Sequence, residues 1–205
     1  HVIGNCGSSP APVGSPVRLA GHTLSTYGDF LKALQKNGTS INVCGLVGHN
    51  SVRRTVMGTQ NRRPTPAELR QMEDLVDEAM RSGAVGLSTG LVSPPGIYSK
   101  TDEIVALARV AARHGGQYSS HIRGEASTLV QAVGEAIQVG REAGLPVQIS
   151  HHKAAGRENW GTTGKTLPMI EAANRNGQRV RVDVSPYHAG SAGMAQLLPP
   201  WAPER

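Results

Sequence analysis

The sequence has few aromatic residues, few cysteines and no long hydrophobic run. Of its 205 residues, 3% are aromatic, 18% are charged and two are cysteines. The apolar runs fall far short of the roughly 18 to 20 residues that a membrane-spanning helix needs, so we expect no membrane contact. Two cysteines exclude a disulfide-stapled scaffold and favour a reduced, cytoplasmic setting. The charged fraction is too low, and the apolar residues are too evenly spread, for a disordered chain.

The positive charge alone does not indicate a nucleic-acid partner. Lys and Arg number 21 against 15 Asp and Glu, which gives a net charge of +6 and a pI near 9.7. The basic residues are scattered in short pairs such as Arg53-Arg54 and Arg62-Arg63, and no aromatic stacking platform accompanies them. We therefore expect a mild attraction for anionic small-molecule substrates and no nucleic-acid binding.

Short β-branched runs alternate along the chain with amphipathic helical stretches. The clearest helix spans 66–82, because Thr65 and Glu68 form a capping box, Pro66 takes the first helical position and Gly83 follows the end. Residues 8–25 and 92–99 are rich in turn-forming residues and predict extended loops. We expect strands at 2–3, 41–47, 84–88, 117–120, 147–150 and 180–184, with further helices at 27–36, 102–114, 127–143 and 167–174.

This alternation predicts an α/β fold built on a parallel sheet. Short, mostly apolar strands separated by helices are typical of sheets that helices cover. Both a barrel and a doubly wound sheet fit the pattern, and the pattern does not separate them. The first residue is not Met and the sequence closes on an apolar stretch, so we expect residues 1–205 to be part of a longer protein.

Three metal-ligating residues follow predicted strands. In both parallel architectures functional side chains gather at the carboxyl ends of the strands, and there the chain has Cys6, His121 and His151. One thiolate and two imidazoles suit zinc, with a fourth position open for water, whose pKa would fall toward about 7. Taken singly, Cys6 could instead be a small buried apolar residue of the core. Each histidine could instead be a polar group whose hydrogen bonds are satisfied within the fold. His152 should point away from His151, since adjacent residues face opposite sides.

The motifs around these residues resemble a known family. Their order is that of the N-acyl-D-amino-acid deacylases, or D-aminoacylases, of the amidohydrolase superfamily. The likeness covers nearly the whole chain, and the ordered set is far more specific than any single motif. The motifs are Gly4-Asn-Cys6-Gly7, Gly48-His49, residues 83–91, Ser120-His121-Ile-Arg123, Ile149-Ser-His151-His-Lys153 and residues 183–190.

The resemblance implies a zinc-dependent (β/α)8 barrel of the TIM type. The chain would supply about strands two to seven, as the central part of the barrel domain, without the flanking strands and the small β-domain of the family. Cys6, His121 and His151 would end strands two, five and six and hold Zn2+. Lys153, Tyr187 and Ser191 would bind the substrate. His49 and Arg123 would line the mouth or brace the ligands; hydrogen bonding at the barrel rim is their alternative role.

The implied activity is hydrolysis of a linear amide that removes the acyl group from N-acyl-D-amino acids. The family's His-x-His pair on strand one and its catalytic Asp on strand eight are not in this chain, so no catalytic residue is assigned and this segment alone should be inactive. The family usually has Tyr-Pro-Tyr where this chain has Ser185-Pro186-Tyr187, so Ser185 replaces a tyrosine that the family is thought to use in binding the substrate carboxylate. Alternatives are hydrolysis of a cyclic amide or an N-acyl dipeptide, and a non-catalytic barrel that binds acidic ligands.

Overall fold

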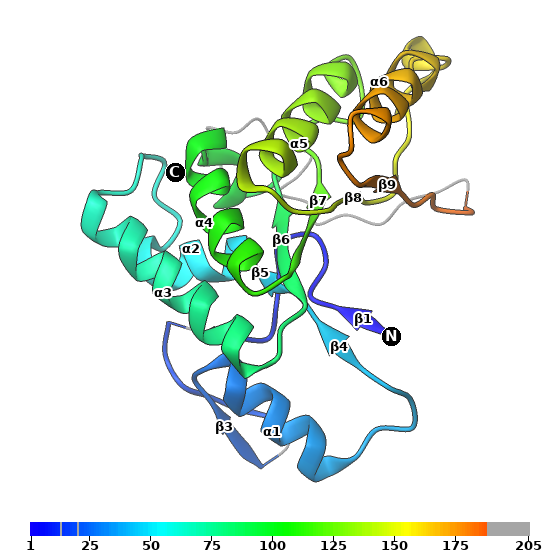
Figure 1. The fold of residues 1–205 in the computed structure, drawn as a ribbon. Coiled ribbons are helices and arrows are strands. Elements are labelled where there is room, and N and C mark those ends of the chain that lie inside the picture. The colour runs from blue at the N-terminus through cyan, green and yellow to red at the C-terminus, as the bar shows by residue number, and fades with distance from the viewer. Residues whose placement is uncertain (13, 20, 188–205) are drawn as a thin grey trace.

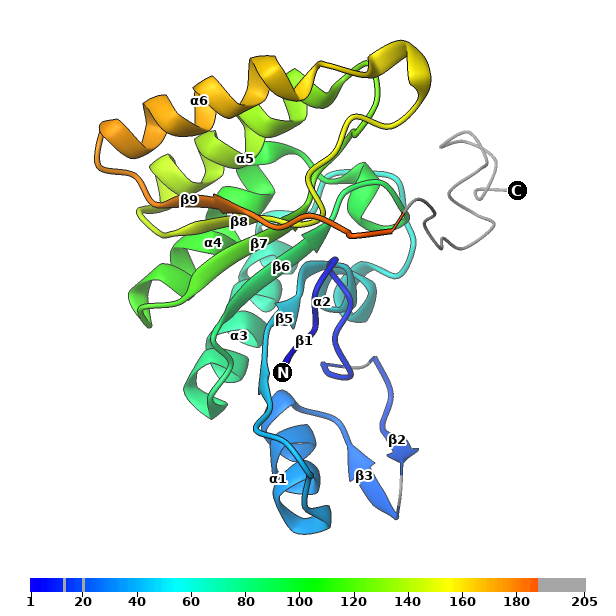
Figure 2. The same ribbon diagram turned by 90° about the vertical axis from the view of Figure 1, so that its right-hand side faces the viewer.

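The main body of the chain is a parallel sheet covered by helices (Figure 1). The structure, a computed structural model, describes residues 1–12, 14–19 and 21–187. Five parallel strands lie side by side in chain order: β5 (Val47–Gly48), β6 (Gly86–Gly90), β7 (Gln117–His121), β8 (Val147–Ile149) and β9 (Val180–Val182). Figure 2 shows helices α3, α4, α5 and α6 along one side of this sheet.

Two shorter sheets extend the main one. Strand β1 (Val2–Ile3) pairs in parallel with β4 (Cys44–Gly45), which is separated from β5 by Leu46 alone. The amide of Leu46 donates to the carbonyl of Ile3 at 2.9 Å, and the amide of Val85 donates to that of Gly45 at 2.9 Å. These bonds continue the order of the parallel strands from β1 through β4 and β5 to β6. An antiparallel hairpin joins β2 (Val17–Leu19) to β3 (His22–Leu24).

Helix α3 (Pro66–Ser82) has the bounds that its sequence predicts. The Thr65 hydroxyl accepts from the Glu68 amide at 3.2 Å, and the Glu68 carboxylate accepts from the Thr65 amide at 2.7 Å. Its buried side chains are Met72, Val76, Ala79 and Met80, which share one stripe of the helix. The other helices are α1 (Tyr27–Asn37), α2 (His49–Met57), α4 (Thr101–Arg113), α5 (Leu129–Ala143) and α6 (Thr163–Arg175), with short 3-10 turns η1 (Gly96–Tyr98) and η2 (Arg157–Asn159). In the described part of the chain, no helix is long and apolar enough to cross a membrane.

The structure corrects several of the sequence-based boundaries, and the strand expected at 84–88 is β6 at Gly86–Gly90. The strand expected at 41–47 is two short strands, β4 and β5, and the loop expected at 8–25 contains the β2–β3 hairpin. Helix α2 was not predicted. It begins without a side-chain cap, and its buried residues include His49, Asn50 and Arg53, so its buried face does not resemble an apolar stripe. Helix α6 begins at Thr163 rather than 167 and includes Pro168 in its interior, whereas the sequence places it at the first turn.

The two faces of the sheet differ in polarity. On the side of the helices, Tyr118 and Leu87 are fully buried, and the Tyr118 hydroxyl lies 2.8 Å from Thr89 Oγ1. On the other side small hydroxyl residues alternate with them: Ser119 Oγ donates to Asn5 Oδ1 at 3.2 Å and lies 3.3 Å from Ser150 Oγ. The apolar core therefore fills the space between sheet and helices, and the opposite face is polar.

A buried ion triad joins α2 to α4. His49 Nε2 lies 2.8 Å from Glu103 Oε1, and Arg53 Nη1 lies 2.7 Å from Glu103 Oε2; the exposed fractions of these side chains are 0% for His49 and Arg53 and 4% for Glu103. Burial opposes ionisation of Glu103, but the hydrogen bond from His49 and the charges of His49 and Arg53 outweigh it and hold the pKa of this carboxyl below its usual 4.5. The triad thus holds α2, which directly follows β5, against α4.

Replacing Glu103 should destabilise the fold strongly. Glu103→Gln leaves the Arg53 guanidinium buried without its counter-charge, which costs about 3 to 5 kcal/mol in the free energy of unfolding. The matched control is Asp102→Asn, which removes an exposed ion pair with Arg63 (2.7 Å; side chains 67% and 64% exposed) and should cost about 0 to 1 kcal/mol. Urea denaturation at pH 7 measures both, and equal losses would contradict a special role for the triad.

The same variant tests the pH dependence. Because folding lowers the pKa of Glu103, the unfolded chain takes up the proton first as the pH falls. The stabilisation is complete above about pH 4.5 and is lost as the pH drops through the folded pKa. Unfolding free energies measured between pH 6 and about pH 3 should therefore fall less steeply in Glu103→Gln than in the parent protein.

Candidate metal centre

Cys6 lies in a turn just after β1 that the end of β6 holds in place. The Gly7 amide donates to Ser88 Oγ at 3.1 Å, and the Ser88 hydroxyl donates in turn to the Gly4 carbonyl. The backbone of Cys6 is left-handed, with φ of 55°. Such a conformation is costly for a residue with a side chain and persists only where the surroundings impose it.

Close backbone packing imposes the left-handed conformation of Cys6. A Cβ at Gly90 would clash with the Cys6 carbonyl, and a Cβ at Gly7 would clash with the Gly90 amide. The buried side chain of Asn50 spans the same junction: its Oδ1 accepts from the Gly90 amide at 3.2 Å and its Nδ2 donates to the Gly90 carbonyl at 3.0 Å. Glycine at 7 and 90 lets the Cys6 turn lie directly on the carboxyl end of β6.

The two histidines come from the next strands of the sheet. His121 is the last residue of β7, and His151 follows β8 with a left-handed φ of 40°. The His151 amide donates to Asp183 Oδ1 at 2.6 Å, and the two imidazole rings meet edge to face at 4.3 Å. His152 points away, as predicted: it is buried, and its Nε2 lies 2.9 Å from Thr166 Oγ1.

One donor atom from each of these residues converges on a common point. The ligand atoms of Cys6, His121 and His151 all lie within 4.8 Å of one another, and Cys6 Sγ is 3.6 Å from His151 Nε2. A soft sulfur with two imidazole nitrogens is a donor set that zinc prefers, and three protein ligands leave a fourth position for water or substrate. The residues fit a zinc ion of the catalytic type.

The electrostatics of the cluster are those of a site for a cation. Hydrogen bonds from His121 and His151 lower the pKa of the Cys6 thiol from 9.0 to about 6, against the opposing effect of burial. The Cys6 sulfur, followed by the Glu125 carboxylate, raises the pKa of His151 to about 9. The thiol and the imidazole thus favour each other's charged forms, and a divalent cation would compete with the imidazolium proton.

Glu125, which the sequence interpretation missed, lies beside this cluster. It follows β7 at the fourth position after His121, and its Oε1 is 2.7 Å from His151 Nδ1 and 4.0 Å from His121 Nε2. Its Oε2 pairs at 2.7 Å with Nζ of Lys153, which also lies 3.3 Å from His151 Nδ1. Lys153, predicted to bind substrate, is thus at the edge of the cluster and 44% exposed. No local pattern in the sequence indicates Glu125, because its shortest contacts are to His151 and Lys153, on the chain after the next strand.

The remaining predicted residues lie elsewhere. His49 is bonded to Glu103 and Asn50, and Arg123 forms two hydrogen bonds to Glu135 and one to the Ile97 carbonyl. These contacts fit the alternative role of hydrogen bonding between elements, and a role of either residue beside the ligands stays a prediction. Tyr187 is 77% exposed. Ser191 lies outside the described residues.

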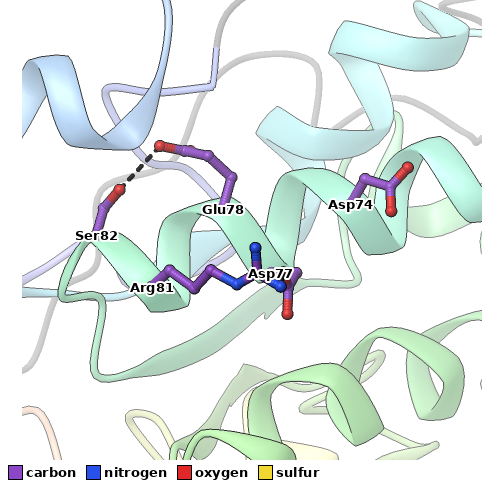
Figure 3. Close-up of a pocket in the computed structure, with 5 residues that line it drawn as sticks. All are labelled: Asp74, Asp77, Glu78, Arg81 and Ser82. Atoms are coloured by element: carbon purple, nitrogen blue, oxygen red, sulfur yellow. Dashed lines mark hydrogen bonds and ion pairs between the residues drawn. The ribbon is translucent and has the colours of Figure 1, made fainter.

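A surface depression lies on α3 (Figure 3), and none of the residues that line it belongs to the cluster. Two of its acids have structural partners: Glu78 accepts from the amides of Tyr27 and Gly28, both at 3.2 Å, and Asp77 pairs with His114 and Arg81, both at 2.8 Å. We assign no chemistry to it. Its volume is about 410 Å³, and it is lined by Asp74, Asp77, Glu78, Arg81 and Ser82.

Comparisons with known proteins agree with the resemblance in the motifs. No protein-family model matches the chain. The D-aminoacylase of Alcaligenes xylosoxydans xylosoxydans is 40% identical over 204 residues, which are 95% of this chain and 42% of that protein. The N-acyl-D-aspartate deacylase of the same organism is 41% identical over 200 residues, 93% of this chain and 40% of that protein. The chain spans about two fifths of the length of these relatives.

Solved structures give the same result. The crystal structure of a D-aminoacylase, which defines a subset of amidohydrolases, superposes with a TM-score of 0.85 at 39% identity over 92% of this chain and 42% of that one. The N-acyl-D-glutamate deacylase of Bordetella bronchiseptica, complexed with zinc and a phosphonate inhibitor, has a TM-score of 0.85 at 36% identity over 91% of this chain and 41% of that one.

The parallel α/β fold is therefore that of the amidohydrolases. Within this class, the chain belongs to the family of the D-aminoacylases and N-acyl-D-amino-acid deacylases, which confirms the family that the six ordered motifs predict.

The lowered pKa of Cys6 predicts its reactivity in the metal-free protein. With a pKa of about 6, the thiol is mostly thiolate at pH 7, so its rate of alkylation by iodoacetamide should rise with a midpoint near pH 6. His121→Asn removes the largest cause of the shift and should move the midpoint up toward the ordinary 9.0. Mass spectrometry of the Cys6 peptide measures the rate. His22→Asn, at a partly buried histidine bonded to Asn37, is the control and should leave the midpoint unchanged.

Proposed function

We propose that the protein to which this chain belongs removes the acyl group from N-acyl-D-amino acids by zinc-dependent hydrolysis of the linear amide. The observation that carries this proposal is the convergence of the Cys6, His121 and His151 donor atoms within 4.8 Å. The names of the relatives support the substrate class, since they are deacylases of N-acyl-D-amino acids, and one of them is complexed with zinc. We expect a small-molecule substrate and, from the two free cysteines, a reduced cytoplasmic setting.

We propose further that residues 1–205 form the central part of a (β/α)8 barrel, about strands two to seven. The order of the parallel strands supports a barrel, because it follows the chain without reversal from β1 to β9. A doubly wound sheet would reverse its strand order at a switch point and carry helices on both faces. Here the helices α3 to α6 lie on one side (Figure 2).

The proposed roles of the residues follow from their positions. Cys6, His121 and His151 would hold zinc. When bound, zinc acts as a Lewis acid on a carbonyl oxygen and lowers the pKa of a water molecule toward about 7. The Lys153 ammonium would pair with the free carboxylate of the substrate, a charge-assisted contact worth about 1.5 to 3 kcal/mol. Tyr187 and Ser191 would add substrate contacts, and the acid–base group, an Asp in the family, is expected outside this chain.

The metal ligands are tested by exchanging each cysteine in the full-length protein. Cys6→Ser removes the thiolate ligand and should weaken zinc binding roughly 100-fold. The binding free energy of zinc in four-ligand protein sites is about 10 to 16 kcal/mol, or about 3 kcal/mol for each ligand. Cys44→Ser, at the other free cysteine, is the matched control and should bind zinc as the parent does. Competition with a chromogenic chelator gives the dissociation constants. Unchanged affinity in Cys6→Ser would exclude this ligand set.

The substrate role of Lys153 is tested by its charge. Lys153→Met keeps the length of the side chain and loses the ammonium, so KM for an N-acyl-D-amino acid should rise roughly 10- to 100-fold, the equivalent of about 1.5 to 3 kcal/mol. Lys165→Met, at an exposed lysine of α6, is the control. Steady-state kinetics on full-length protein, with the acyl amino acid and with its carboxamide, distinguish carboxylate recognition from a general loss of activity. An equal effect on both substrates would argue against carboxylate recognition.

A further inference from the structure

Glu125 is held at the cluster by both its backbone and its side chain. Its carbonyl accepts from the Ala155 amide at 2.7 Å, which ties the chain after β7 to the chain after β8. A Cβ at the preceding Gly124 would clash with Thr128 Oγ1, so the turn is tight. The Glu125 side chain is 16% exposed and reaches His151 and Lys153 at 2.7 Å each. It is a fixed anion between two elements that carry proposed metal ligands.

The two nitrogens of His151 face different partners. Nε2 faces Cys6 Sγ at 3.6 Å. Nδ1 faces Glu125 Oε1 at 2.7 Å and, farther away, Lys153 Nζ at 3.3 Å. Glu125 Oε1 is buried and, among the described residues, accepts no hydrogen bond of good geometry. It is therefore an open acceptor at hydrogen-bond distance from the ring nitrogen that points away from the cysteine. An imidazole that binds a metal through one nitrogen commonly donates the other N–H to a carboxylate, which fixes its tautomer and orientation.

We propose that Glu125 is a positioning residue for the metal centre: it accepts the Nδ1 proton of His151, so that Nε2 is the ligand atom, and it holds Lys153 beside the same ring. This inference rests on the proposed zinc site. At 2.7 Å from Nδ1, Oε1 is the acceptor that would take this proton if His151 bound the metal through Nε2. Because Oε2 binds the Lys153 ammonium, one carboxylate connects the metal ligand His151 with the residue proposed to bind the substrate carboxylate.

A neighbouring ion pair supplies a matched control. Glu135 of α5 pairs with Arg123 at 2.9 Å and is 13% exposed, close to the 16% of Glu125, but its partners are not metal ligands. Replacing either glutamate by leucine removes a mostly buried carboxylate. Loss of fold stability should be comparable in the two variants, whereas loss of zinc affinity should be confined to position 125.

The experiment measures zinc affinity in full-length protein by chelator competition. Glu125→Leu should bind zinc roughly 10- to 100-fold more weakly than the parent, Glu135→Leu within about twofold of it, and Glu125→Gln, which keeps an acceptor oxygen, between the two. Equal affinities in the two leucine variants would overturn the inference. If Cys6→Ser binds zinc as tightly as the parent protein, the proposed zinc site is wrong. That outcome differs from equal zinc affinities in the two leucine variants, which would contradict only the role of Glu125.

A second measurement needs no variant to fold. Nitrogen-15 NMR of the zinc-loaded parent, labelled at histidine, identifies the protonated and the metal-bound nitrogen of each ring. The inference requires His151 to carry its proton on Nδ1 and the metal on Nε2. Metal on Nδ1 of His151 would overturn it, whatever the affinities of the variants.

Discussion

The candidate site depends on one constraint, the direction of the strands. Cys6 and His151 are 145 positions apart in the chain, yet the sulfur of one lies 3.6 Å from a ring nitrogen of the other. They meet because β1, β7 and β8 run in parallel, so that their carboxyl ends lie at the same edge. An antiparallel arrangement would send alternate strand ends to opposite edges and separate the donors. The chemistry is thus a consequence of the crossover helices, which return each strand in the same direction.

The polarity of the sheet makes room for the Cys6 turn. Ser88, Ser119 and Ser150 occupy the face away from the helices, and their hydroxyls bond to the Cys6 turn, to Asn5 and to one another. Larger side chains at these positions would fill the space into which residues 4–7 fold. The apolar residues needed for stability are placed on the opposite face, where the helices cover them. The same strands therefore provide a packed core on one side and a lined site on the other.

How far the sequence predicts this arrangement depends on whether the signal is local. Helix α3 is predicted to the residue because its capping box, proline and final glycine lie within the helix or next to it. Cys6, His121 and His151 are predicted as a set because each follows a strand, and the family resemblance supports them. The sequence does not predict helix α2 or the position of Glu125, for a shared reason. His49 of α2 is bonded to Glu103, and Glu125 contacts His151, so each depends on a partner that is distant in sequence. Burial of charge through tertiary contacts leaves no periodic pattern in the chain.

The strain at the ligands indicates how the site is prepared for metal. Among the described residues, the non-glycine residues with positive φ are Cys6 and His151, both proposed ligands. Left-handed backbone is unfavourable for such residues, so the fold must hold each in place. The Gly7–Gly90 contact does so for Cys6, and the bond from the His151 amide to Asp183 does so for His151. Because these contacts are made between protein atoms, they orient the donors, and little of the binding energy of a cation is needed to order them. A mobile cysteine turn would bind the same ion more weakly with the same three ligands.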